Sequence, residues 1–211
     1  MNQKQLWEQL AHKNSRYYIN SDKGKGITEE EFLKSGWDDF MAHVWKDNTL
    51  TGSFRFKDSV IVDIGCGTGR ILRFMADYFK KVIGVDISSE MIKQAKERMQ
   101  TCSNYELYET DGETIPLSGD SVDIVFSYLV FQHMKTREMV EKNFFEAYRV
   151  LKKDGVFKVR LRTDEIQNME NWWAGVNYTE PQIKELSIRC GFTVIKLEYV
   201  KDYGVWVWLR K

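Results

Sequence analysis

Three glycines at alternate positions, Gly65, Gly67 and Gly69, form the stretch of this sequence best suited to chemistry. They follow an apolar run at 60–64 and precede an amphipathic run at 71–79. A residue without a Cβ allows positive φ and lets a ligand approach the backbone closely. The helix start beyond the turn offers unpaired N–H groups and the positive end of a helix dipole. The pattern predicts a strand, a turn and a helix that cradle a ligand, although a plain tight turn would also use glycines.

A second acid, Asp86, ends another short apolar run at 81–86. It lies about twenty residues beyond the turn, where Rossmann-like folds place a carboxylate that accepts hydrogen bonds from ribose hydroxyls. The alternative is a helix-capping role, for which Ser88 is better placed. The glycine spacing also differs from the Gly-x-Gly-x-x-Gly of dinucleotide binders. We therefore expect a ligand that contains a nucleoside.

Composition limits the remaining classes of function. The 211 residues suit one domain with a modest extension, and Lys+Arg and Asp+Glu both number 31, so no basic field favours nucleic acid. The three cysteines are far apart and predict neither a disulfide framework nor a metal site. No apolar run is long enough for a membrane span, and the polar N-terminus does not read as a signal peptide. We expect a cytoplasmic protein that is a monomer or a weak homo-oligomer.

Apolar runs alternate with amphipathic ones along the chain, as in βαβ units. A helix is expected at 135–151, a turn at Asp154 and Gly155, and a strand at 156–161. Two adjacent strands, 192–199 and 203–209, close the chain as a hairpin. The expected fold class is α/β, with a Rossmann-like, mostly parallel seven-stranded sheet, helices on both faces and a C-terminal antiparallel hairpin.

Residues 1–57 are unusually aromatic and precede the first core strand. We expect them to form an N-terminal helical extension or lid on a domain at 58–211, with a capping box at 28–31 that starts a helix. The aromatic side chains either pack the extension onto the sheet or form a roof over the site. Tyr17, Tyr18 and Trp37 are the candidates for the roof.

From about residue 60 to the C-terminus, the chain resembles the class I S-adenosylmethionine-dependent methyltransferases, especially the small-molecule, type 11/12-like branch. Several motifs in the right order are more specific than any one of them. The matching stretches are 62–70, 84–91, Asp111-Gly112, 126–133 and 149–155.

The resemblance implies S-adenosylmethionine as the cofactor and S-adenosylhomocysteine as its product. Asp63 and the glycine turn would meet the amino-acid end, and Arg70 either pairs with the ligand carboxylate or projects to solvent. Asp111 would bind the adenine amino group or, alternatively, only form a polar turn. The expected cofactor-binding residues are Asp63, Gly65, Cys66, Gly67, Gly69, Arg70, Asp86, Ile87, Met91, Asp111, Gly112, Tyr128 and Phe131.

The methyl acceptor is expected near residues that follow the fourth strand. His133 is the candidate general base, with a structural hydrogen-bonding role as the alternative. Further substrate or lid candidates are Tyr17, Tyr18, Trp37, Gln132 and Trp172. The sequence lacks the Asn/Asp-Pro-Pro-Tyr/Phe and Pro-Cys motifs of nucleic-acid methylation, which favours a small-molecule acceptor with an O, N or C nucleophile. The alternatives are another transfer reaction on this fold, such as aminopropyl transfer, and a catalytically silent cofactor-binding subunit.

Overall fold

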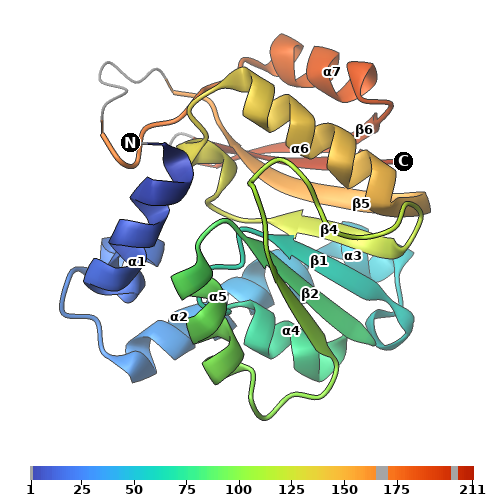
Figure 1. Ribbon diagram of the computed structural model, residues 1–211. Coiled ribbons are helices and arrows are strands. Elements are labelled where there is room, and N and C mark those ends of the chain that lie inside the picture. The colour runs from blue at the N-terminus through green and yellow to red at the C-terminus, as the bar shows by residue number, and fades with distance from the viewer. Residues whose placement is uncertain (1, 165–170, 201–203) are drawn as a thin grey trace. The chain divides into compact units, whose positions relative to one another are not determined.

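The computed structural model describes residues 2–164, 171–200 and 204–211 (Figure 1). The chain divides into two compact units, Met1–Thr110 and Asp111–Lys211. Tyr203, the first residue of the predicted last strand, lies outside the described residues.

Three parallel strands form the sheet of the first unit, in the order β3-β2-β1. Ile61 and Val62 of the first strand have no exposed surface, as expected for a strand covered on both faces. The glycine turn and α4 connect the first two strands, and α5 connects the second to the third. These elements are β1 (Val60–Ile64), α4 (Leu72–Tyr78), β2 (Lys81–Asp86), α5 (Ser89–Arg98) and β3 (Tyr105–Glu109).

The N-terminal extension is helical and well packed. Capping boxes start its two longest helices, one at Asn2 with Gln5 and the predicted one at Thr28 with Glu31. Buried side chains lie along the whole segment, among them Phe32 and Leu50. The extension therefore shares its core with the first unit, and a boundary at residue 57 stays a prediction. Its elements are α1 (Gln3–Ile19), a 3₁₀ turn (Ser21–Lys23), α2 (Glu29–Phe40), a π-helical turn (Met41–Trp45), α3 (Asn48–Ser53) and a 3₁₀ turn (Phe56–Asp58).

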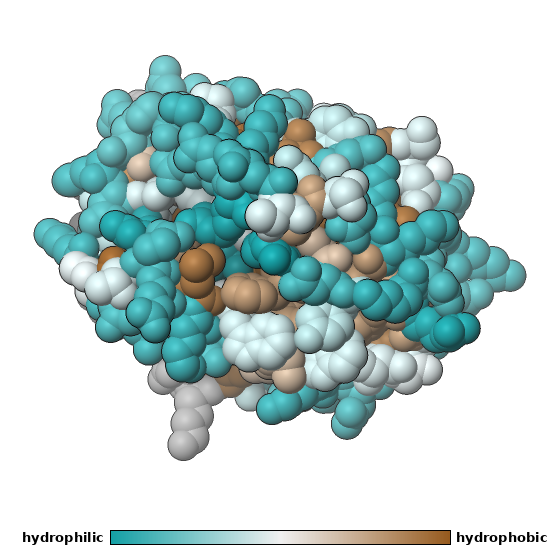
Figure 2. All heavy atoms as spheres, turned by 90° about the horizontal axis from the view of Figure 1, so that it is seen from below, coloured by the Kyte–Doolittle hydropathy of each residue, from teal (hydrophilic) through white to brown (hydrophobic). Residues whose placement is uncertain are grey.

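An aromatic cluster joins α2 to α4. Both helices lie on the lower side of the first unit in Figure 1. The ring centroid of Trp37 lies 5.5 Å from that of Phe74, and Tyr78 lies 5.1 Å from Phe40 and 4.6 Å from Trp45. Figure 2 views the molecule from below and shows white and brown side chains gathered in the middle of the face among hydrophilic ones. Each such ring pair adds about 0.5–1.5 kcal/mol beyond its buried area. Trp37 thus packs α2 against α4.

The second unit contains four strands in the order β4-β5-β7-β6. The first two run parallel, and the last three are antiparallel neighbours, which confirms the predicted C-terminal hairpin within the sheet. With the three strands of the first unit and the surrounding helices, the seven-stranded, mostly parallel Rossmann-like fold class is confirmed. The elements are β4 (Val122–Ser127), a 3₁₀ turn (Phe131–His133), α6 (Arg137–Val150), β5 (Leu151–Arg162), α7 (Glu180–Arg189), β6 (Thr193–Val200) and β7 (Gly204–Arg210).

The prediction that a helix reaches residue 151 and turns at Asp154 was wrong. The helix ends at Val150, and β5 begins at once with Leu151, which pairs with Val122. The next pair joins Ile124 to Val156, so the expected turn is a bulge inside one long strand. Asp154 adopts a φ of +64° there. Between these two pairs β5 advances by five residues and β4 by two, so β5 carries three extra residues, more than the single one of most bulges.

Candidate functional site

The glycine turn has the backbone geometry that its sequence predicts. Gly65, Gly67 and Gly69 have φ values of +72°, +54° and +75°, in the left-handed region that favours glycine. The N–H groups of Gly65 and Cys66 both donate to the carbonyl oxygen of Val85, at 2.8 and 3.1 Å. The turn is thereby fixed to the last residues of β2.

Asp86, the last residue of β2, bonds directly to this turn. One carboxylate oxygen accepts from the N–H of Gly67 and the other from the N–H of Ser88, each at 2.9 Å. Burial raises the pKa of Asp86 to about 6, although these backbone N–H groups act to lower it. Ser88 caps α5 by accepting from the N–H of Met91, as predicted. Each carboxylate oxygen has two lone pairs, so Asp86 retains acceptor capacity for a ligand hydroxyl.

Asp63 and Arg70 are both buried on either side of the turn. Burial, followed by the nearby charge of Asp86, raises the pKa of Asp63 to about 8, while Arg70 opposes that rise. Arg70 donates through one guanidinium nitrogen to Asp39 at 2.6 Å and to Ser35 at 3.1 Å. It therefore does not project to solvent, and it anchors α2 to the turn. Whether it also meets a ligand carboxylate stays a prediction.

The end of α1, in the extension expected to form a lid, lies on the glycine turn. The Cδ1 atom of Ile19 is 3.0 Å from the position that a Cβ on Gly67 would occupy. Glu8, near the start of α1, accepts from the hydroxyls of Ser88 at 2.6 Å and Ser89 at 2.8 Å. The capping pattern Asn2-x-x-Gln5 was the available signal for this helix. α1 thus covers the turn and holds the first turn of α5.

The other predicted site residues of the first unit lie on α1, in the glycine turn and near the start of α5. Tyr17 and Tyr18 of α1 pack edge to face with centroids 4.9 Å apart. Cys66 and Met91 are buried, and Ile87 is half-buried beside Asp86. Burial raises the pKa of the Cys66 thiol, which keeps it protonated and unreactive at neutral pH.

In the second unit, Asp111 and Gly112 form a polar turn. The Asp111 carboxylate accepts from the N–H groups of Glu113 at 2.9 Å and Thr114 at 2.7 Å, and these bonds lower its pKa. Gly112 has a φ of +84°, and its carbonyl accepts from Asn143 at 2.8 Å. The turn that we weighed as an alternative is therefore formed, and an additional adenine contact by Asp111 stays a prediction.

Tyr128 and Phe131 lie beyond the end of β4. The Tyr128 ring stacks on Trp206 with centroids 5.3 Å apart. Phe131 is buried in an aromatic group, 6.0 Å from Phe144 and 5.9 Å from Phe157. Phe131 belongs to the core of the second unit and Tyr128 is half-buried, and their roles toward a ligand stay predictions.

His133 is buried, and both of its ring nitrogens have neighbours. Nδ1 lies 3.0 Å from the carbonyl oxygen of Trp173, which can only accept, so Nδ1 carries the proton. Nε2 then accepts from the amide nitrogen of Gln132 at 3.2 Å, and the ring stacks on Trp172. Burial lowers the pKa of His133 to about 4, with the positive charges of Arg162 and Lys135 acting in the same direction. This environment favours the structural alternative for His133 over a general base.

Replacing His133 with glutamine is expected to reduce the acid sensitivity of the fold. A folded pKa near 4, below the ordinary 6.5, adds stability that is complete above pH 6.5 and is lost as pH falls toward 4. The wild type should lose about 2 kcal/mol more than the variant between pH 7.5 and pH 5. Urea unfolding at the two pH values measures this difference. The raised pKa values of Asp63 and Asp86 stabilise the fold as pH falls, which is opposite to the effect of His133. This contribution is the same in the wild type and the variant, so it cancels in the comparison. Equal losses would contradict the expectation.

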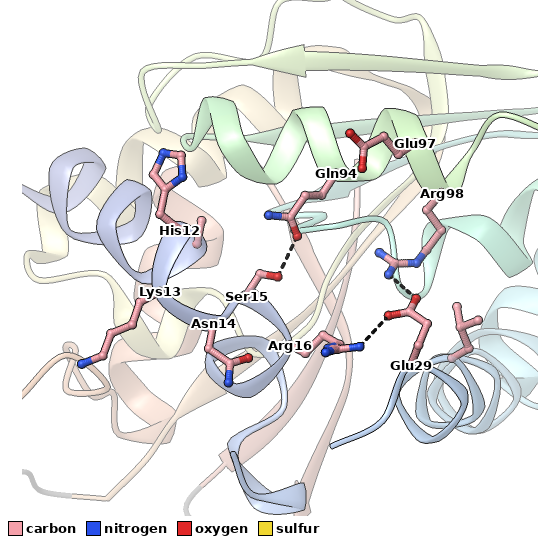
Figure 3. A pocket seen from close by; sticks show the side chains of 11 residues that line it. His12, Lys13, Asn14, Ser15, Arg16, Glu29, Gln94, Glu97 and Arg98 are labelled. Carbon is pink, nitrogen blue, oxygen red and sulfur yellow. Dashed lines mark hydrogen bonds and ion pairs between the residues drawn. The ribbon is translucent and has the colours of Figure 1, made fainter. Parts of the chain in front are cut away.

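A polar groove of about 820 Å³ lies between α1, α2 and α5 of the first unit (Figure 3). Arg16 and Arg98 approach Glu29 from two sides, and Ser15 donates to Gln94 at 2.7 Å. The groove is lined by Ala11, His12, Lys13, Asn14, Ser15, Arg16, Glu29, Leu33, Gln94, Glu97 and Arg98. The glycines of the turn and Asp86 are not among these lining residues.

Within residues 2–164, 171–200 and 204–211, no group of three or more His, Cys, Asp or Glu side chains could hold a metal ion. None of the helices in that part of the chain is both long and apolar enough to span a bilayer. The cysteines, all within it, are free thiols.

Comparisons with known proteins agree with this geometry. Residues 62–159, which contain the glycine turn and Asp86, match the family described as "Methyltransferase domain". Malonyl-[acyl-carrier protein] O-methyltransferase of Enterobacter lignolyticus is 30% identical over 118 residues, which cover 56% of this chain and 45% of that protein. Protein arginine N-methyltransferase 1 of Dictyostelium discoideum is 28% identical over 188 residues, covering 82% and 53%. The chain thus spans about half the length of the curated relatives it matches.

Solved structures show the same fold. A protein from Aquifex aeolicus, titled a SAM dependent methyltransferase, superposes with a TM-score of 0.63 at 19% identity, covering 87% of this chain and 98% of that one. A S-adenosylmethionine dependent methyltransferase from Mesorhizobium loti gives 0.65 at 19% identity, covering 81% and 100%. At such identities the likeness establishes the fold.

Proposed function

We propose that this chain transfers a methyl group from S-adenosylmethionine to a small molecule. Its residues 62–159 belong to the methyltransferase domain family, and its fold is that of the S-adenosylmethionine-dependent enzymes. The observation that carries the proposal is the bond from the N–H of Gly67 to Asp86. It brings a backbone cradle and a ribose-binding carboxylate together in one unit. The family and the fold support a methyl donor as the ligand of that cradle.

The charges of the site fit this cofactor. Burial and, after it, the charge of nearby Asp86 raise the pKa of Asp63 to about 8. A ligand with an ammonium and a sulfonium would offset that repulsion, because an opposite charge favours the ionised carboxylate. Asp86 would accept from the ribose hydroxyls, and Asp63 would face the ammonium directly or through water. Gly67 and Gly69 would admit the ligand to the backbone.

The chemistry asks little of the protein beyond alignment. When bound, the cofactor supplies a methyl group that its sulfonium charge already activates. The chain's own task is to orient the two reactants in line and to exclude water. α1 serves that task, since Ile19 lies on the turn and Glu8 holds the hydroxyls of Ser88 and Ser89. Tyr17, Tyr18, Gln132 and Trp172 stay proposals for the acceptor side.

A small acceptor is favoured over a folded protein because α1 covers the turn. The names of the relatives point to other acceptors, a malonyl group on a carrier protein and protein arginine, which are therefore included in the test. The acceptor atom is an O, N or C nucleophile. Because His133 is buried and hydrogen-bonded at both ring nitrogens, its role as a general base is the weaker alternative.

The test is to incubate the full chain with S-adenosylmethionine and a metabolite panel and to measure S-adenosylhomocysteine release. Malonyl-acyl carrier protein and an arginine-rich peptide form two further arms. Release with small metabolites alone supports the proposal, and release only with a protein arm replaces the acceptor class. Calorimetry with S-adenosylhomocysteine runs in parallel. Binding without release in any arm would indicate the catalytically silent subunit, and no binding would exclude the cofactor.

A further inference from the structure

Arg98, near the end of α5, reaches back to the glycine turn. Its guanidinium donates through Nη1 to the carbonyl oxygen of Thr68, and through Nη2 it pairs with Glu29 at 2.6 Å. The Arg98 side chain is only 15% exposed and Glu29 is 50% exposed, so solvent weakens the bond to buried Thr68 less than the ion pair. Thr68 stands between Gly67 and Gly69, at the centre of the turn that meets the ligand.

Glu29 extends this connection to the N-terminal helices. Its second oxygen pairs with Arg16 of α1 at 3.2 Å, so one carboxylate of α2 holds guanidinium groups from two other helices. Figure 3 shows Arg16 and Arg98 pointing toward Glu29 from two different sides. Arg16 and Glu29 are about half exposed, and surface pairs of this kind contribute only about 0–1 kcal/mol. The buried bond from Arg98 to the Thr68 carbonyl is therefore stronger than the ion pairs that Glu29 makes.

We propose that Arg98 is a positioning residue for the methyl donor, acting by fixing the peptide unit between Thr68 and Gly69. The Thr68 carbonyl and the Gly69 N–H belong to one planar unit, so holding the carbonyl also orients the N–H. That N–H donates to the Cys66 carbonyl at 3.0 Å and closes the turn. With glycine on one side, the peptide unit can rotate once the carbonyl is released.

The choice of ligand rests on the proposed function, but the positioning role does not. A purely structural reading holds that Arg98 only docks α2 onto α5 through Glu29. The two readings differ in which bond of Arg98 matters. Glu29→Gln removes the ion pair and keeps the Thr68 bond, whereas Arg98→Met removes both. Arg98→Lys keeps a positive donor that can reach one of the two partners.

The first measurement is hydrogen exchange at the amides of residues 66–70 in the ligand-free protein. Arg98→Met is expected to speed exchange there about tenfold, the equivalent of ~1.4 kcal/mol. Glu29→Gln should change it less than about twofold, as for a surface pair. Arg73→Met, which removes a cation paired with Asp77 on α4, is the matched control and should have no effect. Unchanged exchange in Arg98→Met, or an equal effect of Glu29→Gln, would overturn the positioning role.

The second measurement is S-adenosylhomocysteine affinity by calorimetry, with melting temperature recorded for every variant. Arg98→Met should raise Kd about tenfold, Arg98→Lys should recover part of it, and Glu29→Gln should bind almost as the wild type does. In turnover, KM for the donor should rise while kcat holds. A lowered melting temperature with unchanged Kd indicates the structural reading. A wild type that does not bind refutes the proposed function, and the exchange result still decides the role of Arg98.

Discussion

Replacing Asp86 with alanine is expected to raise the Kd for S-adenosylhomocysteine ten- to a hundredfold or more. The variant loses charge-assisted bonds to the ribose, each worth about 1.5–3 kcal/mol, at 1.4 kcal/mol per tenfold. It also leaves the N–H of Gly67 without the carboxylate that accepts it at 2.9 Å, so the turn loses part of its order. Calorimetry on the variant and the wild type gives the ratio directly.

Two further variants make the result specific. Asp86→Asn keeps the size of the side chain but presents an NH₂ group to one of the two N–H donors at Gly67 and Ser88. It should therefore bind more weakly than the wild type as well. Asp77→Ala removes an exposed carboxylate from the end of α4 and should leave the Kd unchanged. If Asp86→Ala binds as tightly as the wild type, the ribose assignment is lost.

Replacing Gly36 with alanine is expected to destabilise the protein by about 1–3 kcal/mol or more, as overpacked sites do. A Cβ on Gly36 would lie 2.3 Å from the carbonyl oxygen of Arg70 and 2.8 Å from its Cγ. The oxygen belongs to backbone at the start of the turn-to-helix segment and cannot move aside cheaply. α2 would have to shift away, which would also strain the bonds from Arg70 to Ser35 and Asp39.

A matched glycine offers the control for this measurement. Gly52 lies in the short helix α3, and a Cβ there would meet nothing within 4 Å. Gly52→Ala should be neutral or stabilise by up to ~1 kcal/mol, because alanine has the higher helix propensity. Urea unfolding of both variants gives the two free energies. If Gly36→Ala proves as stable as Gly52→Ala, then α2 is not held closely against the turn.

The sequence was informative wherever function depends on a few neighbouring residues. The turn at Gly65, Gly67 and Gly69 was predictable because positive φ selects glycine position by position. Asp86 was predictable because strand length fixes its distance from that turn. The caps at Thr28 and Ser88 follow from short local patterns and were confirmed.

The missing parts of the site are those made by distant residues. Glu8, Asp39 and Arg98 are ordinary charged side chains on helices, and nothing local separates them from exposed ones. Their partners lie far along the chain, as with Arg98 and Thr68, 30 residues apart. The same limit applied to His133, whose partner Trp173 is 40 residues away. Only the folded geometry shows which of these side chains are buried and paired.

The contacts between the N-terminal helices and α5 affect how long the N-terminal segment stays exposed during synthesis. Glu8 bonds to Ser88, which is 80 residues later in the chain, and Glu29 bonds to Arg98, which is 69 residues later. At 5–20 residues per second, a ribosome needs roughly 4–16 s to make the first of these intervals. During that time the aromatic N-terminal segment has emerged before the α5 surface that will cover it exists. The nascent chain therefore exposes Phe32, whose ring centroid lies 5.3 Å from the Arg98 guanidinium carbon in the folded protein, to chaperones and to other nascent chains until α5 has been made.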